Sequence, residues 1–369
     1  MRLRKWCVTN IIILIAFITW ILTLFAKGNP SKVEKIYSST IYPYVGKTVG
    51  KISGIVPFSL GEVMIYIVVL IVLGFILTII VKPRLIIVNI KEVLHIIIRA
   101  ICLAYTLFYF LWGFNYYRQD YMVLAGIDSA DPTIEDLEYF TLKTIESANR
   151  IRVDLDEDEN GIFKLDKNFK NLGLSANQSF SGVYIGDVGL DGKYGRAKPL
   201  MISKWMSYTG ITGIYFPYTM EANINTDVAD VTIPATICHE IAHQRGFAKE
   251  EEANFISYLI SVNHEDPNFQ YSGHYLALQY LLSDIKKQDI DLYYDIREKI
   301  SEEINRDMEN NYLYWKEKEG KVEEVATTLN DNYLKANNQK SGVESYNGVV
   351  ELLLTTYKTQ GYPLYLKTN

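Results

Sequence analysis

The chain contains two histidines four residues apart, His239 and His243, with Glu240 directly after the first. Residues four apart share one face of a helix, so both imidazole rings can bind one metal ion while Glu240 lies beside it. Zn²⁺ accepts neutral imidazole and carboxylate ligands, and a catalytic zinc site combines three protein ligands with a water. A carboxylate beside that water can take its proton and later give it to the leaving amine. The spacing therefore predicts a zinc hydrolase in which both histidines bind the metal and Glu240 is the general base.

The third ligand must come from outside this motif. Three consecutive carboxylates follow it, namely Glu250, Glu251 and Glu252. Gly246 indicates the end of the motif helix, because glycine readily adopts the left-handed conformation of a helix cap. A second helix would then begin near Glu250 and fold back toward the metal, with Glu250 and Asn254 on one face. We expect Glu250 to bind the metal and Asn254 to hydrogen-bond a ligating histidine, and Glu252 is the alternative ligand.

The same residues also admit a purely structural interpretation. The two histidines would then be satisfied polar residues of a core helix, and the three acids would form a solvated charge run. That interpretation leaves unexplained why two histidines, a base and a carboxylate-bearing helix follow one another, so we favour the metal site. Cys238 precedes the first histidine but points to another side of the helix, and we expect it to be a small core residue.

The block from His239 to Phe255 reads H-E-I-A-H-Q-R-G-F-A-K-E-E-E-A-N-F. It resembles the motif block of a bacterial membrane-protein family catalogued as domain-of-unknown-function family 3810, whose members are similar to gluzincin zinc metallopeptidases. The resemblance extends to residues 210–217, 223–230 and 55–62, and it thus covers most of the chain.

This resemblance implies a zincin-like fold and a particular ligand set. Gluzincins carry a Glu that binds zinc and, four residues later, an Asp that orients a histidine. Matched to this chain, the pattern assigns Glu250 as ligand and Asn254 to the position of the Asp. Asparagine can still accept a hydrogen bond from an imidazole, but it lacks the charge that raises ligand basicity. The resemblance therefore implies a zinc site of lower affinity or activity, and it implies no particular substrate.

Three apolar segments precede the motif, at about residues 6–26, 63–81 and 95–117. Each is long enough to cross a bilayer as a helix, so we expect three transmembrane spans. The first could instead be a cleaved signal peptide. Leu24 and Ala26 make a poor cleavage site, however, which favours an uncleaved anchor.

Basic residues suggest the orientation of these spans. They occur in the N-terminal tail and between the second and third segments: Arg2, Arg4, Lys5, Lys82, Arg84 and Lys91. Such residues favour a cytoplasmic location, although lysines in the first connection weaken the pattern. Residues 1–117 would then be the transmembrane region of a multi-pass protein in the bacterial cell membrane, with the lipid bilayer as a partner. Residues 118–369 would form an extracytoplasmic metallopeptidase domain.

The segment after residue 118 predicts one α+β domain, mostly helical with a small antiparallel sheet. Thr133 indicates the cap of an amphipathic helix that runs to about Val153. Residues 214–216 and 221–225 flank Pro217 and predict a hairpin just before the motif helix. Further amphipathic helices are expected near residues 275–286, 292–318 and 346–358.

The predicted hairpin suggests how a substrate would bind. The edge of such a strand can pair with an extended peptide. Asn223 or Asn225 could contact the substrate backbone there, or both could be solvent-facing strand residues. Tyr346 could stabilise the oxyanion, although a packing role is the alternative for one tyrosine among 28.

An acidic loop, Asp156 to Gly161, matches the opening of an EF-hand. Lys167 stands where the bidentate Glu of such a loop belongs, so we expect a solvated turn instead of a calcium site. The net charge of −6 argues against a nucleic-acid partner, and three cysteines imply no disulfide framework.

These features together predict a membrane-anchored zinc metallopeptidase with a peptide or protein substrate. Two alternatives remain open. One is a non-catalytic, zinc-stabilised extracytoplasmic sensor or binding module, and the other is a zinc hydrolase of non-peptide amides such as those of the cell wall.

Overall fold

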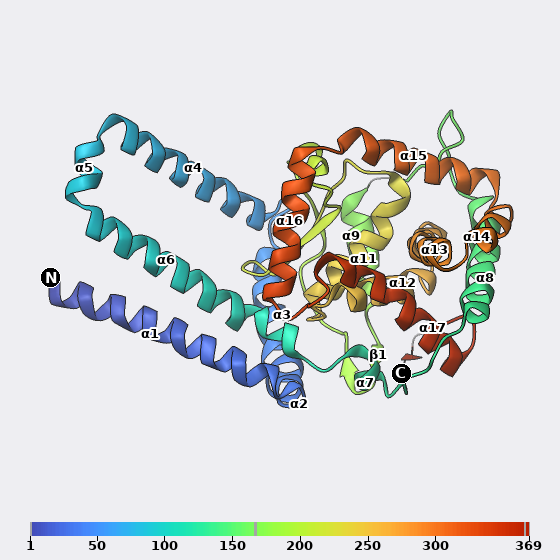
Figure 1. Ribbon diagram of the computed structural model, residues 1–369, viewed down its shortest axis with the longest axis horizontal. Coiled ribbons are helices and arrows are strands. Elements are labelled where there is room, and N and C mark those ends of the chain that lie inside the picture. Colours follow the sequence, from blue (N-terminus) through green and yellow to red (C-terminus); the bar gives the residue numbers. More distant parts are fainter. Residues whose placement is uncertain (1, 166–167, 365–366, 369) are drawn as a thin grey trace.

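The computed structural model describes residues 2–165, 168–364 and 367–368, with side chains from residue 11 to residue 364. A mostly helical body carries long apolar helices that project from one side (Figure 1). The projecting helices are α1 (Arg2–Lys27), α4 (Leu60–Val81) and α6 (Ile90–Leu111). A short helix, α5 (Pro83–Val88), joins α4 to α6 at the end far from the body, where the N-terminus also lies.

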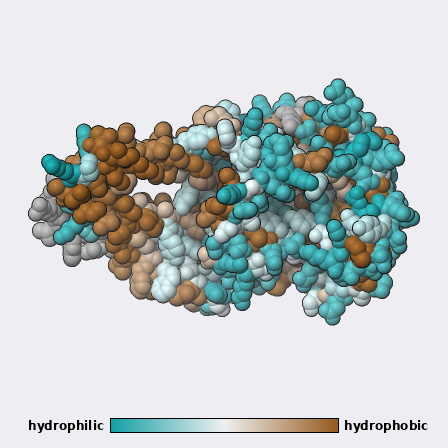
Figure 2. Space-filling view, turned by 45° about the horizontal axis from the view of Figure 1, so that its top comes forward, coloured by the Kyte–Doolittle hydropathy of each residue, from teal (hydrophilic) through white to brown (hydrophobic). Residues whose placement is uncertain are grey.

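Two helices, α4 and α6, are long and apolar enough to cross a membrane, and almost none of their side chains are buried within the protein. A third candidate is Ile11–Lys27 together with Pro30–Ser53, if this pair, bent by 116°, counts as one span. Apolar side chains gather over this end of the molecule, whereas the body is mostly hydrophilic (Figure 2). Two or three helices could therefore cross a membrane.

The third apolar segment differs from the predicted span at 95–117. Its helix, α6, begins earlier, at Ile90, and ends at Leu111, after which a 3-10 helix, η2 (Gly113–Tyr117), follows. The side chains of η2 are buried against the body, so its aromatic residues belong to a protein core and not to a lipid interface. Gly113 permits this packing, because a Cβ there would lie 2.7 Å from the ring of Phe108.

The connection between α1 and α4 packs onto the body. It comprises α2 (Pro30–Val33), a π-helix η1 (Glu34–Ile41) and α3 (Tyr42–Ser53). Glu34 forms a buried ion pair with Arg118 at 2.8 Å, and Tyr42 Oη donates to the backbone carbonyl of Gln244 at 2.9 Å. Residues from the predicted transmembrane region thus form part of the core next to the helix that carries His239 and His243.

The body begins with α7 (Tyr121–Ala125) and α8 (Ile134–Arg152). The predicted cap of α8 is confirmed, because Thr133 and Asp136 form a reciprocal capping box. The predicted helix at 292–318 is interrupted, since α14 ends at Arg297 and Ser301 caps α15. The remaining helices are α9 (Phe169–Ser179), α10 (Ser203–Met206), η3 (Ser207–Thr209), η4 (Asp230–Thr232), α11 (Ile233–Gln244), α12 (Glu250–Val262), α13 (Pro267–Gln288), α14 (Ile290–Arg297), α15 (Glu302–Lys318), α16 (Lys321–Ala336), η5 (Gly342–Gly348) and α17 (Val349–Gln360).

Two three-stranded sheets complete the body. The first has the order β2-β1-β6 and is antiparallel, with β1 (Val183–Ile185), β2 (Val188–Gly189) and β6 (Lys367–Thr368). The second has the order β3-β5-β4, with β3 (Lys198–Pro199), β4 (Gly213–Phe216) and β5 (Glu221–Ile224). The predicted hairpin is confirmed as the antiparallel pair β4–β5, and the second sheet differs from the expected antiparallel sheet only in β3, which pairs with β5 in parallel. A two-residue strand leaves no periodicity that could reveal this pairing.

The acidic loop is a turn closed by its own carboxylate. Asp158 Oδ1 accepts hydrogen bonds from the amides of Asn160 and Ile162. Lys167, which bears on the calcium prediction, lies outside the described residues.

Candidate metal centre

The motif helix α11 is packed in the core. Ile237, Cys238, Ile241 and Ala242 are fully buried, and Cys238 is a free core cysteine as expected. The helix ends with Gly246 at a φ of +91°, a conformation that side chains rarely adopt. A Cβ there would also lie 2.9 Å from the ring of Tyr42. The tight turn lets α12 begin at Glu250 and lie against α11, as the sequence predicts.

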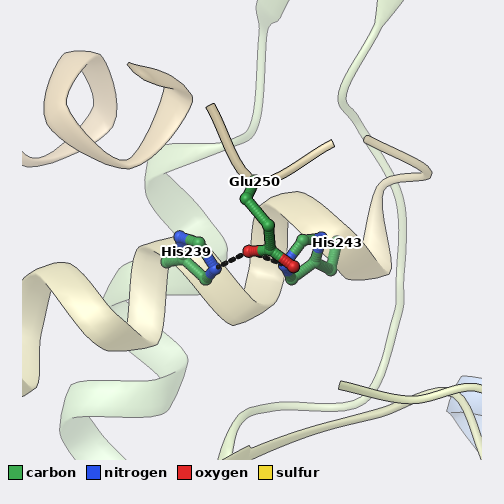
Figure 3. Close-up of side chains that lie close together, drawn as sticks. All are labelled: His239, His243 and Glu250. Atoms are coloured by element: carbon green, nitrogen blue, oxygen red, sulfur yellow. Dashed lines mark ion pairs between the residues drawn. The ribbon is translucent and has the colours of Figure 1, made fainter. Parts of the chain in front are cut away.

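The two histidines and Glu250 converge on one point (Figure 3). Glu250 Oε2 lies 3.2 Å from His239 Nε2 and 3.3 Å from His243 Nε2. Bonds of about 2.1 Å to a tetrahedral zinc ion place its ligand atoms about 3.4 Å apart. Among the described residues these three side chains form the one group of acids, histidines and cysteines that could hold a metal ion. The donor types and their separations fit Zn²⁺.

The ring of His243 is oriented by backbone and aromatic contacts. Its Nδ1 lies 2.7 Å from the carbonyl oxygen of Phe247, which favours a proton on Nδ1 and directs Nε2 toward Glu250, where it could bind a metal ion once deprotonated. Trp112, the first residue after α6, donates from Nε1 to the His243 carbonyl at 3.2 Å, and its ring lies edge-on to the imidazole. The end of an apolar projecting helix therefore contacts a candidate metal ligand directly.

Burial and opposite charge set the ionisation of these groups. Burial alone would raise the pKa of Glu250, but the adjacent histidines lower it well below its usual range. Burial alone would lower the pKa of His243, but the Glu250 carboxylate raises it to about 9. Without a metal, the site is thus a buried imidazolium–carboxylate pair at neutral pH.

This pair would make the binding of a metal ion dependent on pH. A histidine ligand must be neutral, so zinc would have to displace a proton from His243 at any pH below its pKa of about 9. We expect the apparent zinc affinity to rise about tenfold per pH unit between about pH 6.5 and 8.5. Calorimetric zinc titrations in buffers of different ionisation enthalpy would measure the affinity and the proton released. An affinity that stays constant over this range would contradict the protonated metal-free pair.

Glu240 lies beside the histidines and beneath β4. Burial raises the pKa of its carboxyl to about 7, and the two histidines oppose the rise. The backbone amide of Tyr215 in β4 hydrogen-bonds one side of the carboxylate. Its Oε2 atom is buried without a hydrogen-bond partner among the residues that the structure describes. An acceptor that is free and buried next to three candidate ligands is suited to taking a proton.

Gly213 in β4 holds Glu240 in this position. A Cβ on Gly213 would lie 2.5 Å from Glu240 Oε1, so an alanine would force the carboxylate to move. We expect Gly213→Ala to lower kcat by about a hundredfold while the zinc content stays unchanged, because a displacement of about 1 Å can cost that much. Metal analysis and steady-state kinetics would test this. Gly74→Ala, at a glycine with no neighbour within 4 Å of the new Cβ, is the control.

Glu252 and Asn254, the two other residues of α12 that the sequence singled out, make contacts away from the two histidines. Glu252, the alternative ligand, accepts a hydrogen bond from the amide of Tyr121 at 2.8 Å and lies 3.6 Å from Lys249 Nζ. Asn254 donates from Nδ2 to Tyr280 Oη at 3.1 Å. In the described part of the chain, no hydrogen bond joins Asn254 to either motif histidine. The hydrogen bond to the His243 ring that was expected from Asn254 is made by the carbonyl oxygen of Phe247 instead.

Asn223 and Asn225 are both buried, so the expectation that they could be solvent-facing is wrong. Asn225 donates to the carbonyl of Ile211 at 2.9 Å and closes the loop before β4. Asn223 donates to the carbonyl of Ile214 at 3.3 Å, and its Oδ1 has no partner among the described residues. The hairpin thus uses at least one of these amides for its own structure.

The charge of Glu250 acts on the hydroxyls of four tyrosines: Tyr116, Tyr280, Tyr333 and Tyr346. Burial raises the pKa of each hydroxyl, and the negative charge of Glu250 raises it further. Tyr346 lies in η5, before α17, and it is also influenced by Glu240. Its role in the site stays a prediction, and nothing in the sequence singled out the other three.

Comparisons with known proteins assign a family. A family model described as "Protein of unknown function (DUF3810)" matches residues 37–354. No curated protein and no solved structure matches the chain. The matched region includes the connection before α4 from Tyr37 onward, both clear candidate spans and the candidate metal centre, so the chain belongs to the DUF3810 family.

Proposed function

We propose that this protein is a membrane-anchored, zinc-dependent metallopeptidase with a zincin-like catalytic body. The observation that carries the proposal is the convergence of His239, His243 and Glu250 beside the buried carboxylate of Glu240. Zinc, when bound, would act as a Lewis acid and make a water nucleophilic near neutral pH. Glu240 Oε2 would take the proton of the attacking water and pass it to the leaving nitrogen.

The sheet next to the metal centre supports a peptide substrate. β4 is an edge strand of the β3-β5-β4 sheet, and its Tyr215 amide faces Glu240. An extended peptide could add to this edge and would then cross the metal centre. Tyr346, close to both Glu240 and Glu250, is a candidate donor to the oxyanion.

The test is proteolysis by the full-length protein purified in detergent. It would be incubated with a diverse peptide library, and the products would be identified by mass spectrometry. We expect zinc-dependent cleavage that a chelator abolishes and added zinc restores. Stoichiometric zinc without cleavage of any peptide would refute the proposal and favour a binding or sensor module. Cleavage restricted to cell-wall amides would favour the alternative of a zinc hydrolase that acts on non-peptide amides.

We further propose that α1, α4 and α6 all cross the bacterial cell membrane, with the body on its outer face. The N-terminus and α5 lie at the end opposite the body. The N-terminal tail carries Arg2, Arg4 and Lys5, and Lys82, Arg84 and Lys91 lie in or beside α5, as expected for a cytoplasmic side. A membrane-impermeant thiol reagent applied to intact cells should label Glu317→Cys in the body but not Arg84→Cys in α5. The reverse pattern would overturn this orientation.

A further inference from the structure

The helix α16 exposes a stripe of apolar side chains. Val322, Val325 and Leu329 are 59%, 59% and 65% exposed, and Tyr333 continues the stripe at 40%. Their spacing of three and four residues places them on one helical face. The adjoining face points inward, where Leu334 is fully buried. The exposed stripe is thus not the side by which α16 packs onto the body.

A second group of exposed apolar side chains adjoins α16. Met201 and Trp205 are both 73% exposed, and Ile202 and Tyr208 are 37% exposed. Tyr208 belongs to η3, which packs against α16. We call the two groups together the apolar surface: Met201, Ile202, Trp205, Tyr208, Val322, Val325, Leu329 and Tyr333.

Both ends of the apolar surface are attached to the candidate spans. The Glu62 carboxylate, in the first turn of α4, accepts hydrogen bonds from the amides of Met201 and Ile202 at 3.0 and 2.8 Å. The ring of Tyr333 lies 6.2 Å from that of Phe108, near the end of α6. The surface therefore runs from the start of one span to the end of the other.

The body also reaches along α6. Tyr218, in the turn between β4 and β5, donates to the carbonyl of Ala104 at 3.1 Å. Ala104 lies about 10 Å before the end of α6, because a helix rises about 1.5 Å per residue. Figure 1 shows α16 on the side of the body from which α4 and α6 emerge, lying across their direction. A helix in this position would lie parallel to the bilayer plane.

We propose that the apolar surface rests in the interfacial layer of the bilayer, with lipid as its partner. Amphipathic helices that lie in this layer bury an apolar face about 5–10 Å below the headgroups. Tryptophan and tyrosine are enriched at the same depth, and the surface carries Trp205, Tyr208 and Tyr333. Continuity with α4 and α6 distinguishes this surface from a docking site for a soluble protein.

The inner face of α16 extends the argument to the substrate. α16 packs against η5, the 3-10 helix that contains Tyr346, and η5 in turn packs against α12, which carries Glu250. α16 therefore joins the apolar surface to the side of the body that holds the candidate metal centre. The candidate active site would then lie at the membrane surface. Its substrate would be a polypeptide tethered to the same bilayer, an inference that rests on the proposed function.

Depth-dependent fluorescence quenching tests the lipid contact without any need for catalysis. The full chain, with its native cysteines replaced by alanine, would carry a bimane label at Leu329→Cys and be placed in vesicles of brominated phospholipid. We expect a loss of most of the emission relative to unbrominated lipid. The matched control, Glu324→Cys on the polar face of the same helix, should retain its emission. Equal emission from the two labels would overturn the proposal, whether the surface is solvated or covered by a protein.

A second measurement tests the substrate class. One peptide would be offered to the enzyme in vesicles, either free or attached to a lipid by a short spacer. We expect the tethered form to be cleaved about a hundredfold faster at equal total concentration. The triple variant Val322→Ser, Val325→Ser, Leu329→Ser should lose most of this advantage while it still cleaves the free peptide. Equal rates for both forms would overturn the inference, whereas an absence of any cleavage would refute the proposed function and leave the quenching result standing.

Discussion

Replacement of Glu240 by glutamine is expected to lower kcat by about 10²–10⁴-fold and to leave the zinc content unchanged. Glutamine has the shape of glutamate and can still accept the amide hydrogen bond of Tyr215, but it cannot take a proton. The buried Oε2 atom of Glu240 has no other partner among the described residues, so the substitution breaks no recorded contact of that atom. Peptide turnover, zinc content and thermal stability would be measured on the same preparation.

The matched control is Glu251→Gln. This acid is also partly buried, and it accepts a hydrogen bond from Gln339 at 3.1 Å, away from the convergent ligands. We expect near-normal turnover from the control. If Glu240→Gln retains full turnover, Glu240 is not the base. If it loses its zinc or unfolds, the carboxylate has a structural role.

Removal of a metal ligand is expected to weaken zinc binding strongly and to lower turnover with it. Glu250→Ala and His239→Ala each leave two protein ligands, and we expect the zinc affinity to fall by at least about 10²-fold, since even outer partners of ligands contribute about 10–100-fold. Zinc content after purification, and competition with a chromophoric chelator, would measure the loss. A catalytic site with three protein ligands tolerates no such removal.

The control for this experiment is Glu252→Gln, which keeps an oxygen to accept the hydrogen bond from the Tyr121 amide. We expect it to retain zinc. If Glu252→Gln loses zinc while Glu250→Ala keeps it, the ligand set is wrong and the alternative predicted from the sequence is right. If neither substitution changes the zinc content, the convergent side chains do not form the metal site.

The sequence predicted the elements whose signals are local. The helical spacing of His239 and His243, and the glycine that ends their helix, implied where Glu250 would lie. Uncharged length identified the apolar helices, and the capping residues of α8 marked its start. Each of these features depends on residues within one or two helical turns, where backbone geometry alone sets the distances.

Contacts between distant segments could not be predicted in this way. The ends of α6 and of the interrupted helix at 292–318 depend on how their side chains pack against the body, so their boundaries were wrong. β3 pairs in parallel with a strand 25 residues later, and Asn254 donates to Tyr280, which is 26 residues away. The burial of Asn223 and Asn225 likewise depends on how other elements pack around their strand.

The sequence by itself therefore determined which two histidines and which acid lie together as a group that could hold a metal ion, and the presence of apolar helices that could cross a membrane. Only the tertiary structure decided that Gly213 lies over Glu240, that Trp112 joins the end of α6 to His243, and that α16 joins an exposed apolar surface to the side of the body that holds the candidate metal centre. The physical reason is that a helical repeat fixes which residues share a face, whereas the partner of that face is chosen by burial and shape over the whole chain.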